Sequence, residues 1–243
     1  MRNPIMLRAI MLSFALLVAV PALADSTSPL GINVEATEPG EWTADFQLDK
    51  CKFTTVGRNE WFSLEPGYQL TLESADERLQ ITVLEDTVQI GKVWTRVVEE
   101  REWESGELEE VSRNFFAMCA ETRDIFYFGE DVDNYEEGQV VSHSSAWRAY
   151  EGDARPGMIM PGKPAISQAY YMEYAPGKAM DRAKVVSLSD SLSTPAGSFK
   201  NCLKVEESSG LNPKEREFKV YAPGIGLIQD EDLLLVMHGF LTK

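Results

Sequence analysis

The sequence predicts an all-β protein in which antiparallel strands follow one another as a meander and form a curved sheet, a half-barrel or a sandwich. Three observations predict this fold class. Apolar and polar residues alternate with a period of two from residue 68 onward. Gly, Pro, Asp, Asn or Ser separate the alternating runs. No segment beyond residue 24 keeps a helical apolar stripe for more than about two turns.

The first 24 residues have the pattern of a signal peptide. Arg2 and Arg8 are their only charges, an apolar run spans residues 9–20, and "PALA" at residues 21–24 resembles a cleavage site. We therefore expect a periplasmic or secreted protein with no transmembrane segment after signal removal. Residues 25–58 are expected to form an N-terminal arm with an edge strand, and residues 59–243 the antiparallel β domain.

The chain is strongly acidic. Its formal net charge is −16, which becomes −18 when the two arginines of the signal peptide are removed (−16 − 2 = −18). Such a charge argues against binding nucleic acid or anionic membrane surfaces through bulk electrostatics. We expect no nucleic-acid partner.

The alternating runs predict the strands in order: "YQLTLES", "RLQITVLED", "VWTRVVEEREW", residues 108–116, "QVVSH", "AKVVSLSD", "FKNCLKVEE", "EFKVYA" and a closing strand after residue 225. The breaks predict hairpin turns around Gly106 and at residues 136–139, and a turn at residues 195–197. Residues 86–91 are expected to connect two strands. Residues 147–180 are rich in Pro and Gly, which predicts irregular loops with short strands.

Cys202 lies within one of these predicted strands. Phe199, Leu203 and Val205 would face the core, so strict alternation places Cys202 on the opposite face. A bulge at Asn201 would turn the thiol inward instead.

Several motifs resemble a recurring pattern in uncharacterised exported bacterial proteins. "TPAGSFKNCLKVEE" matches TPAG(S/T)F with an embedded Cys, and "KVYAPGIGLIQD" matches YAPG(I/V)GL. "WFSLEPGYQLTLE", "YFGEDVDNYEEGQVVSH" and "PGMIMPGKP" are also similar, so that the resemblance covers about residues 59–230. At fold level that family is similar to secreted half-barrels, such as lipoprotein carriers, in which a curved antiparallel sheet wraps around an apolar interior. The resemblance implies a binding or carrier protein for a lipid or another apolar or amphiphilic ligand, with no catalysis and no cofactor.

Three cysteines remain after signal removal, which allows one disulfide within the chain. Cys202 lies in a motif that the resemblance covers, and we expect it to be a buried structural thiol. Cys51 lies outside that region, and Cys119 falls where the family pattern has a polar turn. The resemblance therefore implies that any bridge joins Cys51 to Cys119.

The sequence offers little for catalysis. It has two histidines and no G-x-S-x-G motif, and nothing connects Cys202 to either histidine. Carboxylates are dense in residues 97–113, where alternation places Glu100, Glu102 and Glu104 on the face opposite Arg101 and Trp103. Charge pairing on a solvated face explains this pattern. A hydrolase with paired carboxylates is an alternative, and it would require two acids in a cleft.

An alternative to the binding of an apolar ligand is a periplasmic metal-binding protein, and the sequence offers two candidate metal sites. Residues 130–137 resemble an exposed acidic loop, in which Glu130, Asp131 and Asp133 could bind calcium weakly, although the EF-hand spacing fails. His143, Met158 and Met160, with Trp147 and Met172 nearby in the sequence, offer the soft donors that suit copper(I). Met158 and Met160 can equally fill gaps in the core.

Overall fold

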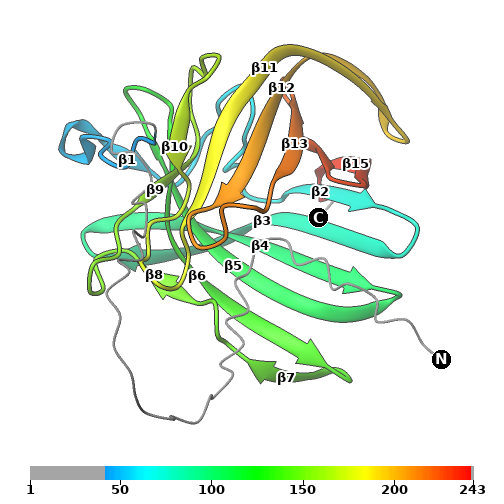
Figure 1. The fold of residues 1–243 in the computed structure, drawn as a ribbon, viewed down its shortest axis with the longest axis horizontal. Coiled ribbons are helices and arrows are strands. Elements are labelled where there is room, and N and C mark those ends of the chain that lie inside the picture. Colours follow the sequence, from blue (N-terminus) through cyan, green and yellow to red (C-terminus); the bar gives the residue numbers. More distant parts are fainter. Residues whose placement is uncertain (1–41, 242–243) are drawn as a thin grey trace, which may run out of the picture.

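The computed structural model describes residues 42–241 as an antiparallel all-β protein (Figure 1). The predicted signal peptide and residues 25–41 of the predicted arm lie outside the described residues. No helix in the described range has the length and apolarity needed to cross a membrane. The elements are η1 (Leu48–Lys50), β1 (Phe53–Thr54), β2 (Tyr68–Glu73), β3 (Glu77–Ile90), β4 (Val93–Glu104), β5 (Glu107–Cys119), β6 (Ile125–Glu136), β7 (Gln139–Ser142), β8 (Trp147–Arg148), β9 (Gly157–Met160), β10 (Ala169–Tyr171), β11 (Asp181–Thr194), β12 (Gly197–Ser209), β13 (Glu217–Ala222), β14 (Gly226–Asp230) and β15 (Leu233–Phe240).

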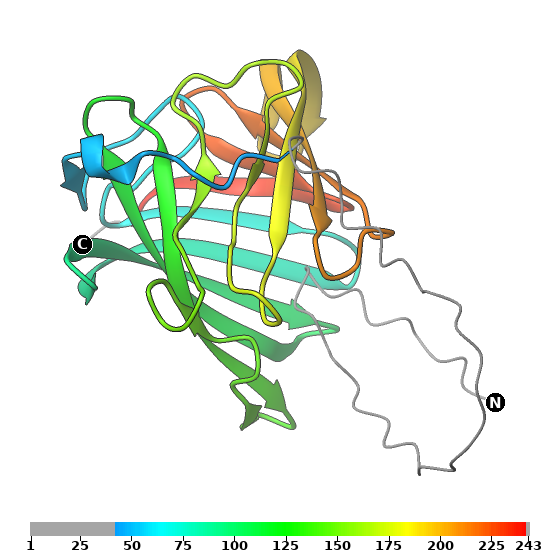
Figure 2. The same cartoon turned by 60° about the vertical axis from the view of Figure 1, so that its left-hand side comes forward.

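The strands form one curved, open sheet, which confirms the predicted fold class. The strand order is β10-β11-β12-β13-β14-β15-β2-β3-β4-β5-β6-β7, with β8 and β9 also paired to β6. Figure 2 shows the sheet curling around one interior. The chain near β9 and β10 then closes much of the remaining gap, since the backbone N–H of Arg155 donates to the carbonyl of Tyr174 at 2.8 Å. The approach is so close that a Cβ on Gly157 would lie 1.9 Å from the carbonyl oxygen of Met172.

The two predicted hairpins are confirmed. The turn between β4 and β5 places Ser105 and Gly106 at positive φ, and the turn between β6 and β7 does the same with Glu137 and Gly138. Two consecutive residues at positive φ match the right-handed twist of the flanking strands. Glycine takes this conformation at no steric cost, so its position in the sequence predicts the turn.

The prediction of a connection at residues 86–91 is wrong. β3 continues through this segment to Ile90, and a bulge between Val83 and Thr87 shifts its register against β4. Arg96 of β4 stabilises the bulge, because its guanidinium donates to the carbonyl oxygens of Leu84 and Glu85. The bulge frees these carbonyls from the ladder, and a buried arginine satisfies them.

The described part of the N-terminal arm packs on the outer face of the sheet. β1 pairs with the end of β5. The ring of Phe53 lies 6.0 Å from that of Phe126 and 5.4 Å from that of Phe128, both from β6. The outer side of β6 is therefore covered by an apolar layer, while its inner side faces the interior of the curved sheet.

Candidate functional site

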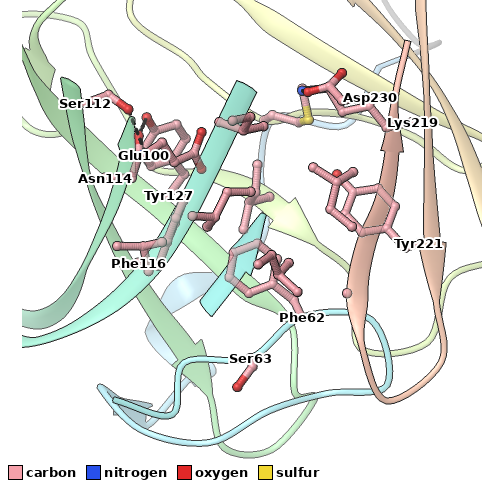
Figure 3. A pocket seen from close by; sticks show the side chains of 18 of the residues that line it. Phe62, Ser63, Glu100, Ser112, Asn114, Phe116, Tyr127, Lys219, Tyr221 and Asp230 are labelled. Atoms are coloured by element: carbon pink, nitrogen blue, oxygen red, sulfur yellow. Dashed lines mark hydrogen bonds and ion pairs between the residues drawn. The ribbon is translucent and has the colours of Figure 1, made fainter. Parts of the chain in front are cut away.

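The interior of the curved sheet holds a cavity of about 150 Å³, lined by residues of β2–β6, β9 and β11–β14. In Figure 3, Glu100, Ser112 and Tyr127 are drawn from one side of this cavity, and Lys219 and Asp230 from the other. The apolar lining includes Trp61, Phe62, Leu70, Leu79, Ile81, Val83, Val98, Phe116, Tyr221 and Leu227. The acidic lining consists of Glu100, Glu102, Glu110, Glu130, Glu173, Asp181, Glu207, Glu217 and Asp230.

The lining changes from apolar to acidic along individual strands. Alternation turns every second residue inward, and on β5 these run from Phe116 through polar side chains to Glu110. On β13 the same change leads from Tyr221 through Lys219 to Glu217. The cavity wall is therefore amphiphilic.

The interpretation of Glu100 and Glu102 as part of a solvated face is wrong. Both side chains line the cavity, and Glu102 is paired across the ladder with Glu110, which is buried. The alternation itself is correct. Sequence reasoning assigned the wrong face to the interior because both faces of β4 carry charged residues.

Lys219 is the one basic residue among the described residues that line the cavity. Its Nζ lies 3.3 Å from a carboxylate oxygen of Glu207 and 3.3 Å from one of Asp230. Burial lowers the pKa of Lys219, but the attraction of Asp230 and Glu207 outweighs this and holds the pKa well above its ordinary value. The ammonium therefore stays charged and compensates part of the acidic lining.

Other acids in the cavity wall have pKa values well above those of ordinary carboxyl groups. Burial, together with repulsion from Glu100, raises the pKa of Glu110 to about 8. Burial also raises the pKa of Glu100 to about 7, where Lys219 opposes the shift and Asp230 adds to it. Lys219 and Asp230 belong to β13 and β14 and line the same cavity as Glu100 of β4, so the acidic parts of these strands face one interior.

A hydrogen-bonded chain connects Glu130 to the inner face of β5. The hydroxyl of Tyr127 lies 3.0 Å from Oε2 of Glu130 and also contacts Oδ1 of Asn114. A hydroxyl has one proton, so it can donate to only one of these oxygens. A protonated Glu130 can donate to Tyr127 while Tyr127 donates to Asn114. This agrees with the pKa of Glu130, which burial raises to about 8.

A second acidic group lies where the chain passes from β10 to β11. The indole N–H of Trp147 donates to Oε1 of Glu173 at 3.1 Å. Burial and repulsion from Asp181 hold the pKa of Glu173 well above its ordinary value. Burial likewise raises the pKa of Asp181 to about 7.

The prediction of an exposed acidic loop at residues 130–137 is wrong. These residues belong mostly to β6, and Glu130 is 5% exposed and faces the cavity. Asp131 lies on the other face of β6 and pairs with Arg148 at 2.6 Å. Asp133 pairs with Arg113 at 3.0 Å. Alternation thus separates Glu130 from the two aspartates, and the three carboxylates do not converge on one ion.

The donors proposed for copper do not come together either. His143 is exposed and lies 2.9 Å from Asp133, near the end of β6. Met158 and Met160 are buried in β9 opposite Phe126 and Ile125. Val132, whose carbonyl contacts His143, lies six positions beyond Phe126 along β6, and an extended strand of that length spans about 20 Å. Within the described range, no group of three His, Cys, Asp or Glu side chains could hold a metal ion.

The structure joins Cys51 to Cys119 in a disulfide and leaves Cys202 as a buried thiol. Asn201 has a φ of 55° and is the extra residue in the ladder, where Cys202 pairs with Asp190 and Lys200 with Ser191. This is the bulge that turns Cys202 inward. The disulfide fastens the described part of the arm to the end of β5.

Comparisons with known proteins give no identification. No family model matches the chain, and no curated protein matches it. Among solved structures, a protein of Parabacteroides distasonis named as a putative lipoprotein aligns with a TM-score of 0.36 and 13% identity, over 75% of this chain and 100% of that chain. At this TM-score the likeness carries no argument about function. The resemblance to an exported bacterial family stays a prediction.

Proposed function

We propose that this protein binds a small amphiphilic molecule inside its curved sheet and acts as an exported binding or carrier protein. The observation that carries the proposal is the cavity, which has apolar and aromatic side chains in one part of its wall and ionisable groups in the other. Ligand sites in proteins are typically concave and apolar, with a few polar groups that fix orientation. The disulfide between Cys51 and Cys119 supports an oxidising compartment.

Hydrolysis by a carboxylate pair is the second candidate function. The pKa of Glu110 and that of Glu130, both raised by burial to about 8, favour it because a general acid works best with a pKa near the working pH. Binding is the better-supported function. Burial raises the pKa of many cavity acids at once, so the raised values do not identify a particular catalytic pair. Neither histidine and no cysteine lines the cavity.

Native mass spectrometry of protein purified from its own host tests the binding function. We expect a small molecule to remain bound during purification, so that the native mass exceeds the mass of the protein alone. Denaturation should release the molecule and remove the extra mass. Ser112→Leu fills part of the cavity and should abolish this extra mass, because Ser112 is buried in its wall. Ser189→Leu, at an exposed position, is the matched control and should retain it. An unliganded mass throughout, with no binding of added amphiphiles, would refute the proposal.

A further inference from the structure

The charge of the cavity wall is strongly unbalanced. Nine carboxylate side chains line the cavity, and Lys219 is the one cation that lines it among the described residues. Lys219 already pairs with Glu207 and Asp230. Burying ionised carboxylates without a partner is costly, so such groups either bind a proton or bind a cation. The interior of this protein is therefore suited to a positively charged occupant.

Two unsatisfied polar atoms provide an independent sign of an occupant. Asp230 is 3% exposed, and its Oδ1 has no hydrogen-bond partner, although Oδ2 pairs with Lys219. Trp61 is 5% exposed, and its indole N–H also lacks a partner. Both residues line the cavity, and Figure 3 shows Asp230 beside Lys219 in its wall. Buried polar atoms are normally paired, so these two mark places where the site is incomplete.

The arrangement favours an organic cation over a metal ion. No three His, Cys, Asp or Glu side chains in the described range are placed to hold a metal ion, so the carboxylates are spread over the wall. An ammonium group has three N–H donors, one of which would satisfy Oδ1 of Asp230. Its apolar body would pack against Phe62, Leu70 and Tyr221, which belong to the same lining.

The volume limits the size of this occupant. The cavity measures about 150 Å³, and an engineered apolar cavity of similar volume in another protein binds benzene. A compact ring or a chain of about six carbons therefore matches the volume inside the cavity. The body of a bulky multi-chain lipid exceeds this volume.

We propose that the cavity binds a small organic amine as its ammonium cation, with the nitrogen at Asp230, the negative charge of Glu100 facing it from the opposite wall, and the apolar body against the aromatic wall. This inference rests on the proposed binding function and specifies the class of its ligand. Glu100 adds negative charge to the site because it lines the same cavity as Asp230 and Lys219, from the facing side (Figure 3).

Calorimetry with three six-carbon probes tests the proposal on the full chain. Hexylamine, hexanol and hexanoate share one apolar body but carry a positive, a neutral and a negative group. At about pH 8 the alkylamine is cationic. We expect hexylamine to bind more tightly than hexanol by about tenfold or more, which is the gain from one charge-assisted hydrogen bond. Hexanoate should bind most weakly.

Variants identify the side chains responsible. Asp230→Asn keeps the shape of the site and removes a charge, and it should weaken hexylamine binding about tenfold while leaving hexanol binding unchanged. Since Asp230 also pairs with Lys219, Glu100→Gln serves as a second variant at a position where no ion pair has to be broken. Asp153→Asn, at an exposed position, is the matched control and should have no effect.

The possible results separate the two proposals. Equal affinities for hexanol and hexylamine would overturn the cation site and leave the binding function intact. Hexylamine binding that survives both Asp230→Asn and Glu100→Gln would also overturn it. Failure of all three probes to bind, together with an unliganded native mass, would overturn the binding function itself.

Discussion

Nζ of Lys219 lies 3.3 Å from Oδ2 of Asp230, and the two residues are direct partners in the ladder between β13 and β14. Asp230 is 3% exposed, so this ion pair is shielded from water. Removing one member of a buried pair leaves the other charge uncompensated. We predict that Lys219→Met lowers the free energy of unfolding by about 3–5 kcal/mol. Urea denaturation followed by tryptophan fluorescence measures this.

Lys200→Met is the matched control for this variant. Lys200 belongs to the neighbouring strand β12 and is exposed. Its substitution should change the free energy of unfolding by no more than about 0.5 kcal/mol. If the two variants were equally stable, the buried ion pair would not contribute to stability as described.

The buried carboxylates predict an unusual dependence of stability on pH. Burial raises the pKa of Glu110 and that of Glu130 to about 8, and that of Asp181 to about 7. Between the ordinary carboxyl pKa of about 4 and these values, the folded protein binds more protons than the unfolded chain. Its stability is therefore greatest at about pH 4–5 and falls as the pH rises through 7 and 8. We expect a loss on the order of several kcal/mol between about pH 5 and 8.

Urea midpoints measured across this range provide the test. Glu110→Gln should reduce the slope, because a neutral amide has no proton to lose. Glu107→Gln replaces an exposed glutamate on the same strand and should leave the slope unchanged. Stability that stays constant or rises from about pH 5 to 8 would show that the cavity acids titrate normally.

The strands and hairpins could be predicted because their signals are local. A period of two and a Gly in a two-residue turn depend on neighbours in the sequence, and Gly106 and Gly138 mark the two predicted hairpins correctly. The bulge in β3 could not be predicted in the same way. It depends on Arg96 of the next strand, whose guanidinium donates hydrogen bonds to the displaced carbonyls.

The candidate site could not be predicted because its members come from strands far apart in the sequence. Glu100 of β4 and Asp230 of β14 influence one another only after the sheet has curled. Alternation correctly grouped Glu100 with Glu102, but it cannot say which face of a strand is enclosed when both faces are charged. The one signal in the sequence that could have indicated the acidic cavity was the large number of acids at alternating positions of neighbouring strands.

Removing the disulfide should destabilise the protein. Cys51 and Cys119 are 68 residues apart, and closing a loop of this length restricts the unfolded chain by about 4 kcal/mol in the chain-entropy model. We predict that Cys51→Ala with Cys119→Ala lowers the free energy of unfolding by about 3–4 kcal/mol. Urea denaturation of this double variant is compared with that of the reduced wild type, which should be similarly destabilised. A double variant as stable as the oxidised wild type would contradict the prediction.

Cys202 should behave as a structural thiol with no redox role. It is fully buried, and burial raises its pKa, which disfavours the reactive thiolate. We predict that Cys202→Ala costs about 1–2 kcal/mol, because the substitution leaves a small cavity. Cys202→Ser should cost more than Cys202→Ala, because its hydroxyl would be buried in an apolar environment.

Peptide mapping of the unreduced, alkylated protein tests the same assignment chemically. The expected result is one peptide pair that joins Cys51 to Cys119, with Cys202 recovered as a free thiol after unfolding. The bulge at Asn201 explains why this thiol is protected, since it turns Cys202 into the core and away from the face that carries the exposed Lys200. A peptide that links Cys202 to either of the other cysteines would contradict both the pairing and the structural role.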